Sequence, residues 1–452
     1  MNDNDLFDEL IKIENSGSPI NQMKIGWHYV LDGKLDFAVY WYEKAAKQDN
    51  TDAMYYLGRI YSGELGECEQ QNDRTAFEWF KAAAELGHTK AQFYVGKALA
   101  SGTGTPADET KAFEWFMKSA EHGDDEAQLE IGLAFLNGNG ADKDEAKAFE
   151  WIMKAAEQDN DKAQLSVGSC YLQGLGTEKN DEEAYKWFLK AAEQNNDESQ
   201  KVVGILLRQG RGVERNTDEA LRWLSKAADQ GNPDAMNELG SMYLHGIGVK
   251  KDEEKAFAYF SGAAEAGHVE AMDNLGTCFL NGYGVDENNS EAFRCFSIAA
   301  DAGLQLAKCR VAYCLLNGIG VEQDCAEAFK RFLEIEYDDN DDEILFFSQM
   351  CSLETFVKYN LGVCYDEGLG TEIDKEKAFD LFKQTESDGF LPAQLKIAQY
   401  YEYKKNYHDA YEYYRLLFLT LDEMIYTTKE LDDIRREAEN GRDYCFTYLR
   451  YM

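Results

Sequence analysis

The chain has 452 residues, of which 44% are hydrophobic, so it is long enough to bury a large core or to form a long array of repeats. Lysine and arginine number 46 and aspartate and glutamate number 84, which gives a formal net charge of −38. Because so acidic a chain repels phosphate backbones, nucleic acid is excluded as an expected partner, and a basic protein is better matched.

The first residues, MNDNDLFDELIKIENSGSP, have neither a basic start nor a continuous apolar run, so no signal peptide is expected. Leu6, Phe7, Leu10 and Ile11 predict that residues 1–20 form a capping segment. No stretch of 18 apolar residues occurs, so no contact with a membrane is expected. The ten cysteines lack C-x-x-C spacing and an even framework, which is typical of reduced thiols and predicts a cytoplasmic protein.

A period of 36 residues organises the chain from about residue 21 to residue 415. The glycine of an apolar-glycine pair recurs every 36 residues from Gly96 to Gly276, and alanine replaces it at Ala312. The next step, to Gly362, is 50 residues and marks a 14-residue insertion near 337–356. A fixed period of this length is typical of stacked helix pairs.

Eight of the repeats also carry a Gly-x-Gly pair, as in LNGNGADKDEAKAFEWIMKAA over residues 136–156. One such pair before a helix can hold a phosphate group. Eight copies without a preceding β-strand cannot be eight nucleotide sites, however, since the dinucleotide fingerprint requires that strand. We interpret each pair as a turn that ends one helix, because glycine adopts a positive φ without steric cost.

Two amphipathic helices are predicted in each repeat. The first carries alanine, an apolar residue, glycine and an aromatic residue on one face, as in Ala127, Ile131, Gly132 and Phe135. The second carries Ala-Phe-x-Trp-Phe and then Lys-Ala-Ala, and its large side chains are expected to stabilise the stack by roughly 2–3 kcal/mol each.

Glycines such as Gly87 are expected to end the second helices. Where they are missing, we expect a left-handed asparagine to replace them, at Asn50, Asn160 and Asn196.

Two segments depart from the repeat. In the insertion, the acidic half is expected to be a solvated loop, and the apolar half, 344–347, either lengthens a helix or forms an exposed anchor. From Tyr407 onward no Gly-x-Gly occurs, and residues 416–452 are predicted to form capping helices.

The pattern A-x-x-x-[LIV]-G-x-x-[YF], then G-x-G, then A-x-x-[WY]-[FL]-x-K-A-A resembles the Sel-one-like repeat family, which is related to the tetratricopeptide repeats. The resemblance implies an all-α fold, a right-handed α-solenoid superhelix of about ten helix-turn-helix repeats. It also implies a protein-protein interaction scaffold or adaptor. An immunity protein that neutralises one basic toxin or enzyme is the alternative, which the negative charge favours slightly.

No catalytic constellation and no metal or cofactor site is expected. His88 and His268 share one repeat position after a capping glycine, which is typical of polar residues at helix starts. Cys170, Cys278, Cys314 and Cys364 share a position that other repeats fill with small or apolar residues, so they are interpreted as core residues.

By analogy with tetratricopeptide repeats, positions two and six after the alanine of each first helix are predicted to face a concave groove that binds a peptide or helix. The alternative is that these side chains pack between helices. The candidate groove residues are Tyr55, Arg59, Phe93, Lys97, Leu129, Leu133, Leu165, Lys201, Tyr313 and Tyr359.

Overall fold

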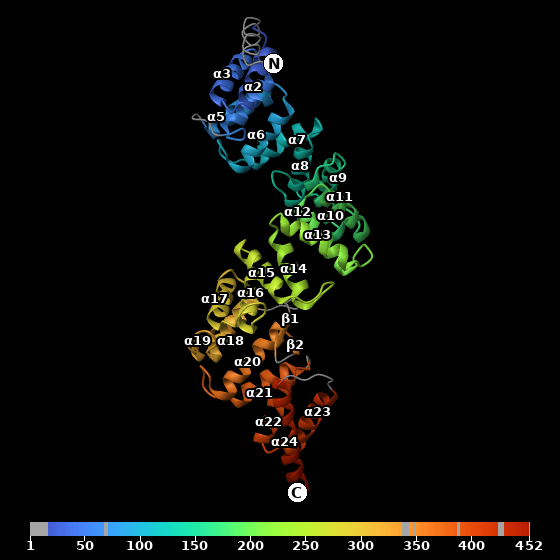
Figure 1. Ribbon diagram of the computed structural model, residues 1–452, viewed down its shortest axis with the longest axis vertical. Helices are drawn as coiled ribbons and strands as arrows, with labels where there is room; N and C mark the ends of the chain where they lie inside the picture. Colours follow the sequence, from blue (N-terminus) through green and yellow to red (C-terminus); the bar gives the residue numbers. More distant parts are fainter. Residues whose placement is uncertain are drawn as a thin grey trace. The chain divides into compact units, whose positions relative to one another are not determined.

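The computed structural model describes residues 17–66, 71–336, 343–346, 349–386, 389–423 and 429–451 (Figure 1). The predicted capping residues Leu6, Phe7, Leu10 and Ile11, together with Phe347, lie outside these ranges. The chain divides into two compact units, Met1–Gln230 and Gly231–Met452. The predicted all-α repeat fold is confirmed, since antiparallel helix pairs make up nearly all of the described chain.

Unit one contains the helices α2 (Pro19–Leu31), α3 (Leu35–Ala46), α4 (Thr51–Tyr61), α5 (Asp73–Glu85), α6 (Thr89–Ser101), α7 (Glu109–Glu121), α8 (Asp125–Asn137), α9 (Glu145–Ala156), α10 (Asp161–Gln173), α11 (Asp181–Glu193), α12 (Asp197–Gln209) and α13 (Thr217–Asp229).

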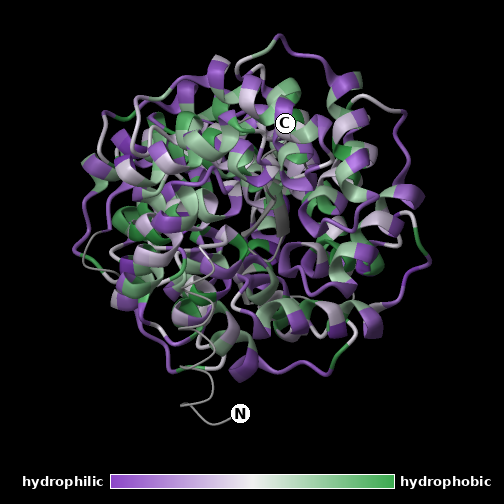
Figure 2. Cartoon of the chain, turned by 90° about the horizontal axis from the view of Figure 1, so that it is seen from above, coloured by the Kyte–Doolittle hydropathy of each residue, from purple (hydrophilic) through white to green (hydrophobic). Residues whose placement is uncertain are grey.

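Unit two contains α14 (Pro233–His245), α15 (Glu253–Glu265), α16 (Val269–Asn281), α17 (Asn289–Asp301), α18 (Gln305–Asn317), α19 (Cys325–Leu333), β1 (Glu343–Phe346), β2 (Gln349–Ser352), α20 (Leu353–Glu367), α21 (Lys375–Gln384), α22 (Leu391–Tyr403), α23 (Tyr407–Glu423) and α24 (Lys429–Tyr451). Many of the loops are hydrophilic, and most of the hydrophobic residues lie along the helices (Figure 2).

In most repeats, a glycine of the first helix packs against a large side chain of the second helix. Phe188 of α11 lies over Gly168 of α10, and Phe260 of α15 lies over Gly240 of α14. A Cβ atom on either glycine would lie 2.7 Å from the ring. The helices of a pair therefore approach closely because glycine leaves room for the ring.

The tryptophans contribute less to this core than the pattern predicts. Trp115 and Trp151 are half-buried, and the ammonium groups of Lys118 and Lys154 lie 3.9 and 3.8 Å from their ring centroids. The next residue in each case, such as Phe116, is the buried one. The tryptophans therefore lie at the edge of the core and form cation-π pairs within their own helices.

The Gly-x-Gly pairs are turns, as predicted. Gly102 ends α6 with a φ of 76°, and its amide donates to the carbonyl oxygen of Ala98. Gly104, with a φ of 70°, lies so close to the preceding repeat that a Cβ atom there would be 2.2 Å from the carbonyl oxygen of Asp73. The first glycine thus ends the helix, and the second allows contact between neighbouring repeats.

The prediction of left-handed asparagines was wrong by one residue. Asn50 and Asn160 have φ values of −75° and −68°. Each side chain accepts a hydrogen bond from the amide three residues later, at the start of the next helix. The residues before them, Asp49 and Asp159, have the positive φ instead. A short polar side chain tolerates this conformation, while asparagine in the extended region is a good N-cap.

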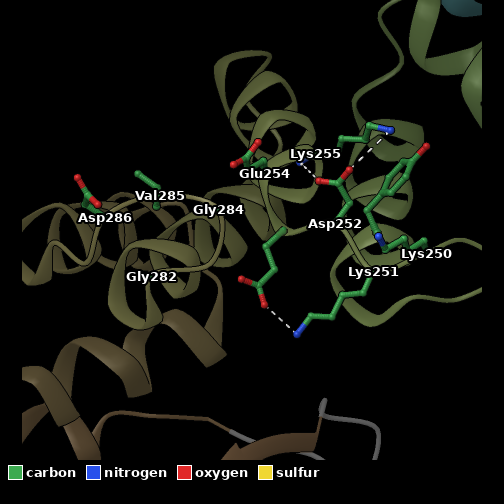
Figure 3. A pocket seen from close by; sticks show the side chains of 11 residues that line it. Lys250, Lys251, Asp252, Glu254, Lys255, Gly282, Gly284, Val285 and Asp286 are labelled. Atoms are coloured by element: carbon green, nitrogen blue, oxygen red, sulfur yellow. Dashed lines mark hydrogen bonds and ion pairs between the residues drawn. The ribbon is translucent and has the colours of Figure 1, made fainter.

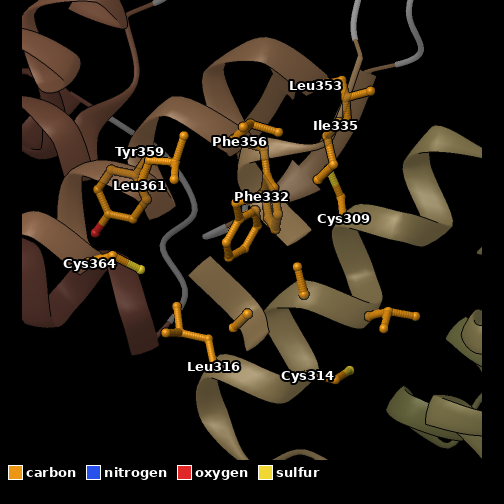
Figure 4. Close-up of a cluster of buried hydrophobic side chains, with 14 of the residues drawn as sticks. Cys309, Cys314, Leu316, Phe332, Ile335, Leu353, Phe356, Tyr359, Leu361 and Cys364 are labelled. Atoms are coloured by element: carbon orange, nitrogen blue, oxygen red, sulfur yellow. The ribbon is translucent and has the colours of Figure 1, made fainter. Parts of the chain in front are cut away.

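The apolar half of the insertion does not lengthen a helix. Strand β1 pairs antiparallel with β2, with Ile344 opposite Cys351, and α20 begins directly after β2. Ser352 caps α20 by accepting from the amide of Thr355. Beside the hairpin, Phe332 of α19 and Phe356 of α20 share one buried cluster (Figure 4).

Candidate functional site

The candidate site is a cavity in unit one, here called slot one, between the end of α4, α5 and α6. It has a volume of about 220 Å³. Phe77 and Phe80 of α5 form one wall, and Tyr94 and Lys97 of α6 form the other. The remaining lining residues are Ser62, Glu64, Asp73, Ala76, Ala98, Ser101 and Thr103.

The same cavity recurs one repeat later, between α6, α7 and α8, and is called slot two. Its volume is also about 220 Å³. Phe113 and Leu133 occupy in slot two the positions of Phe77 and Lys97 in slot one, 36 residues earlier. Because the lining positions repeat with the period of the sequence, slots one and two lie at equivalent positions of neighbouring repeats.

A polar network closes one side of slot one. The hydroxyl of Tyr94 donates to Glu64 Oε2 at 2.8 Å, and Arg59 Nε donates to the same oxygen at 3.1 Å. Burial and the Glu64 carboxylate raise the pKa of Tyr94, so its hydroxyl stays protonated and keeps donating. The ring of Tyr94 stacks on Phe80 at 4.6 Å between centroids, and Lys97 Nζ lies 5.7 Å from it.

In unit two the equivalent cavity lies between α20, α21 and α22 and is smaller, about 130 Å³. The ring of Tyr400 stacks on Phe379 with 4.1 Å between centroids. Tyr400 holds the position that Ala98 holds in slot one, so a tyrosine there occupies space that slot one leaves open.

A wider hollow in unit two, about 1180 Å³, is lined mainly by charged residues (Figure 3). Lys251 Nζ lies 2.8 Å from Glu253 Oε1, and Lys255 Nζ lies 3.7 Å from Asp252 Oδ2. Since these lysines are balanced by adjacent carboxylates, the hollow has little preference for a ligand of either charge.

The structure places the predicted groove residues in three environments. Phe93, Leu129 and Tyr359 lie in the core with 7%, 7% and 8% of their surface exposed, so packing between helices, the alternative interpretation, describes them. Half-buried residues form the second group: Tyr55, Arg59, Leu133, Leu165, Lys201 and Tyr313. Lys97 is exposed and lines slot one, and Leu133 lines slot two.

Position three after the alanine, not position two, faces the slot. Tyr94 lines slot one and Glu130 lines slot two, whereas Phe93 and Leu129, which were predicted to face a groove, line neither slot. One residue turns a helix by about 100°, which is enough to move a side chain from the core to the slot. Positions three, six, seven and ten lie on one face of a helix, and this spacing could have identified the residues that line the slot.

The predicted roles of the histidines and cysteines agree with the structure. Nδ1 of His88 accepts from the amide of Ala91 at 3.0 Å and caps α6, and His268 caps α16 in the same way. Cys170 and Cys278 are buried thiols, and burial raises their pKa values to about 11 and about 12. Thiols held in the neutral form are poor nucleophiles and poor metal ligands.

Within the described ranges, no three side chains of histidine, cysteine, aspartate or glutamate are grouped so that they could hold a metal ion. In the same part of the chain, no helix has both the length and the apolar composition needed to cross a bilayer.

Comparison with known proteins identifies the repeat. The Sel1 repeat family matches residues 33–50, 51–88, 89–124, 125–160, 161–196, 198–232, 233–268, 269–304, 305–330 and 357–389. No curated protein sequence matches the chain significantly.

Solved structures share the fold over much of the chain. The protective antigen c5321 of uropathogenic Escherichia coli, which displays an SLR fold, is 25% identical with a TM-score of 0.75, over 97% of this chain and 94% of that one. A Sel1 repeat protein from Oxalobacter formigenes is 29% identical with a TM-score of 0.53, over 68% of this chain and 90% of that one.

The immunity protein Pa5087 of Pseudomonas aeruginosa is 20% identical with a TM-score of 0.33, over 48% of this chain and 81% of that one. A likeness of this size carries no argument for toxin neutralisation.

Proposed function

Because the chain belongs to the Sel1 repeat family, we propose that it is a non-enzymatic scaffold or adaptor that binds a segment of a partner protein in slots one and two. Sel1 repeat proteins mediate protein-protein interaction, which supports this class of function. The observation that carries the proposal is the recurrence of one cavity at equivalent positions of neighbouring repeats. Such a row is suited to an extended or helical segment with regularly spaced side chains.

The walls of the slots favour apolar side chains of the partner. Phe77 and Phe80 line slot one, and Phe113, Phe116 and Leu133 line slot two, so aliphatic or aromatic groups can be buried there. The net charge of −38 favours basic residues in the rest of the partner, since long-range attraction raises the association rate. The proposed ligand is therefore a segment with apolar anchors in a basic protein.

The test fills each slot with a larger side chain. Ala98→Tyr and Ala134→Tyr introduce at each slot the residue that the chain itself carries at Tyr400. A partner is first captured from the source organism's lysate and identified, and its affinity for both single variants and the double variant is then measured by titration calorimetry. We expect the double variant to lose about 100-fold in affinity or more, because two anchor sites are blocked.

Ala82→Tyr is the matched control, since it makes the same change on α5 where the next repeat carries the exposed Lys118. It should leave the affinity unchanged. A partner that binds the double variant and the control equally well would show that the slots are not the binding surface. Circular dichroism and the unfolding midpoint confirm that each variant is folded.

A further inference from the structure

A hollow of about 610 Å³ lies near the C-terminal end of unit two, where α24 packs against both α22 and α23 (Figure 1). Four tyrosines contribute to its lining, namely Tyr403 of α22, Tyr407 and Tyr414 of α23, and Tyr444 of α24. Tyr403 and Tyr444 are 63% and 45% exposed, so solvent reaches their rings. We call this space the tyrosine hollow.

The wall that α24 contributes is organised like the wall that α6 contributes to slot one. In both walls the lining residues follow one another at steps of three, one and three, and in α24 they are Glu437, Asn440, Gly441 and Tyr444. This spacing places all four residues on one face of the helix. The buried ring of Tyr414 packs directly on Gly441, so α23 and α24 approach closely and Tyr414 forms the floor of the hollow.

Two carboxylates, Glu402 of α22 and Glu437 of α24, also line the tyrosine hollow. The hydroxyl of Tyr414 donates to Glu402 Oε2 at 2.9 Å, and Gln399 Nε2 donates to Glu437 Oε2 at 3.0 Å. Among the described residues, no hydrogen bond or ion pair involves the Oε1 atom of either carboxylate. Each carboxylate therefore keeps one acceptor oxygen for a ligand.

These carboxylates lack the cations that neutralise a comparable group in the neighbouring cavity. There, between α20, α21 and α22, Asp366 Oδ1 lies 2.6 Å from Lys375 Nζ, and Asp366 Oδ2 lies 3.2 Å from Lys396 Nζ. In the described part of the chain, no lysine or arginine forms an ion pair with Glu402 or Glu437. The tyrosine hollow thus combines negative charge with aromatic rings, which favours a cationic ligand.

We propose that the tyrosine hollow binds the guanidinium group of an arginine side chain from a partner polypeptide. A guanidinium group is planar and has five N–H donors, so it can stack on a tyrosine ring and donate to carboxylates from two helices. The ammonium group of lysine is more strongly hydrated and has no flat face to stack. The proposal does not depend on slots one and two, which belong to unit one, so the tests of the two sites are separate.

Lys405 also lines the tyrosine hollow, and its charge opposes a cation there. The adjacent Lys404 pairs with Glu376 outside the lining. Two carboxylates and one ammonium group still leave the lining with a net negative charge. Replacing Lys405 should therefore strengthen binding, a result that a loss of folding cannot imitate.

The experiment titrates the full chain with N-acetyl-arginine methylamide, a probe with one guanidinium group and no other charge, and follows the probe by NMR. We expect Glu402→Gln and Glu437→Gln each to raise Kd about 3-fold, and the double variant to raise it about 10-fold. Glutamine keeps an acceptor oxygen, so the bonds from Tyr414 and Gln399 remain. Lys405→Gln should lower Kd about 3-fold.

The matched control is Glu439→Gln, which makes the same change of charge on α24, two residues from Glu437 and outside the lining. It should leave Kd unchanged. If it weakened binding as much as Glu437→Gln, the general negative charge of the chain would explain the attraction, and the proposal would be overturned. N-acetyl-citrulline methylamide, which has nearly the same shape without the charge, should show no measurable binding.

Two further probes test the identity of the ligand. Equal affinity for Nα-acetyl-lysine methylamide would show that the site does not select a guanidinium group. Free arginine that bound about 10-fold more tightly than the capped probe would identify a small molecule, and not a polypeptide, as the source of that group. Either result would overturn the assignment to an arginine side chain of a partner.

Discussion

The ring of Phe116 lies directly against Gly96, so a Cβ atom on residue 96 would be 2.6 Å from the ring atom Cδ1. The contact joins the first helix of one repeat to its own second helix, 20 residues later. It recurs with Ile152 over Gly132 and with Leu224 over Gly204. The distance between the two helices of a repeat is therefore set by a glycine, which has no side chain, and by the large side chain that packs on it.

Gly96→Ala should destabilise unit one by about 1–3 kcal/mol, because the ring of Phe116 must shift within a packed core. Replacing Phe116 by leucine in the same chain should recover part of that loss, since leucine is the natural partner of Gly204. The free energies of unfolding of both single variants and the double variant, from urea titrations, measure the coupling. Additive effects would show that the contact is not the cause.

Much of the fold could be predicted from the sequence because the same residue types recur at equivalent positions of many repeats. The period from Gly96 to Gly276, the turns at the Gly-x-Gly pairs and the core role of Cys170 all follow from comparing repeats. The hairpin of β1 and β2 could not be predicted in this way. It occurs once, in the insertion, and a short apolar run does not distinguish a strand from a helix without its pairing partner.

The prediction of the groove residues depended on which face of each first helix lies outside the core. Position two after the alanine was assigned to a groove by analogy, and Phe93 and Leu129 lie in the core. Aromatic residues occur at both positions, as in Phe93 and Tyr94, so hydrophobicity alone does not decide between them. Slot one is also lined by Phe77, which belongs to another helix. The sequence pattern of one helix does not show how that helix packs against a second one.

Because Phe93 is buried and Lys97 is exposed, replacing each with serine should change the stability by very different amounts. Phe93→Ser should lower the stability of unit one by about 3–5 kcal/mol, since it leaves a cavity and a buried hydroxyl. Lys97→Ser should change the stability by less than about 0.5 kcal/mol, because its side chain is exposed. Urea unfolding followed by circular dichroism measures both. If Phe93→Ser changed the stability as little as Lys97→Ser, Phe93 would not be a core residue and the groove interpretation would be favoured.

A row of glutamines connects neighbouring repeats of unit one. The side chain of Gln164 donates to the carbonyl oxygen of Ala156 at 3.3 Å and accepts from Gln194 at 2.9 Å. Gln164 also donates to Asp159 Oδ1 at 3.4 Å. Gln164→Leu keeps a similar volume but removes these bonds, so it should destabilise the unit by about 0.5–1.5 kcal/mol.

Gln194→Leu alone should cost less, because Gln194 is exposed and water can replace its bond to Gln164. The two effects should not add, since both variants remove that same bond. The cycle is measured by urea unfolding of the four proteins. A Gln164→Leu variant as stable as the wild type would show that the row contributes nothing to stability.

His88 predicts a pH dependence with a definite sign. Burial lowers the pKa of His88 below its ordinary 6.5, although Asp52, 3.2 Å from Nε2, opposes the shift. The neutral ring is also the form that caps α6, since Nδ1 must accept from the amide of Ala91. The folded state thus binds a proton less readily than the unfolded state. The contribution of His88 is complete above about pH 6.5 and is lost as the pH falls from that value towards the folded pKa.

His88→Asn separates this effect from the many carboxylates of the chain. Asparagine is the natural cap at Asn160 and Asn196 and does not titrate, so the variant should retain the cap at every pH. We expect the wild type to lose stability relative to this variant between about pH 7 and about pH 5, measured as the difference in unfolding free energy. Parallel curves across that window would mean that protonation of His88 does not disturb the cap, because all other titrating groups are common to the two proteins.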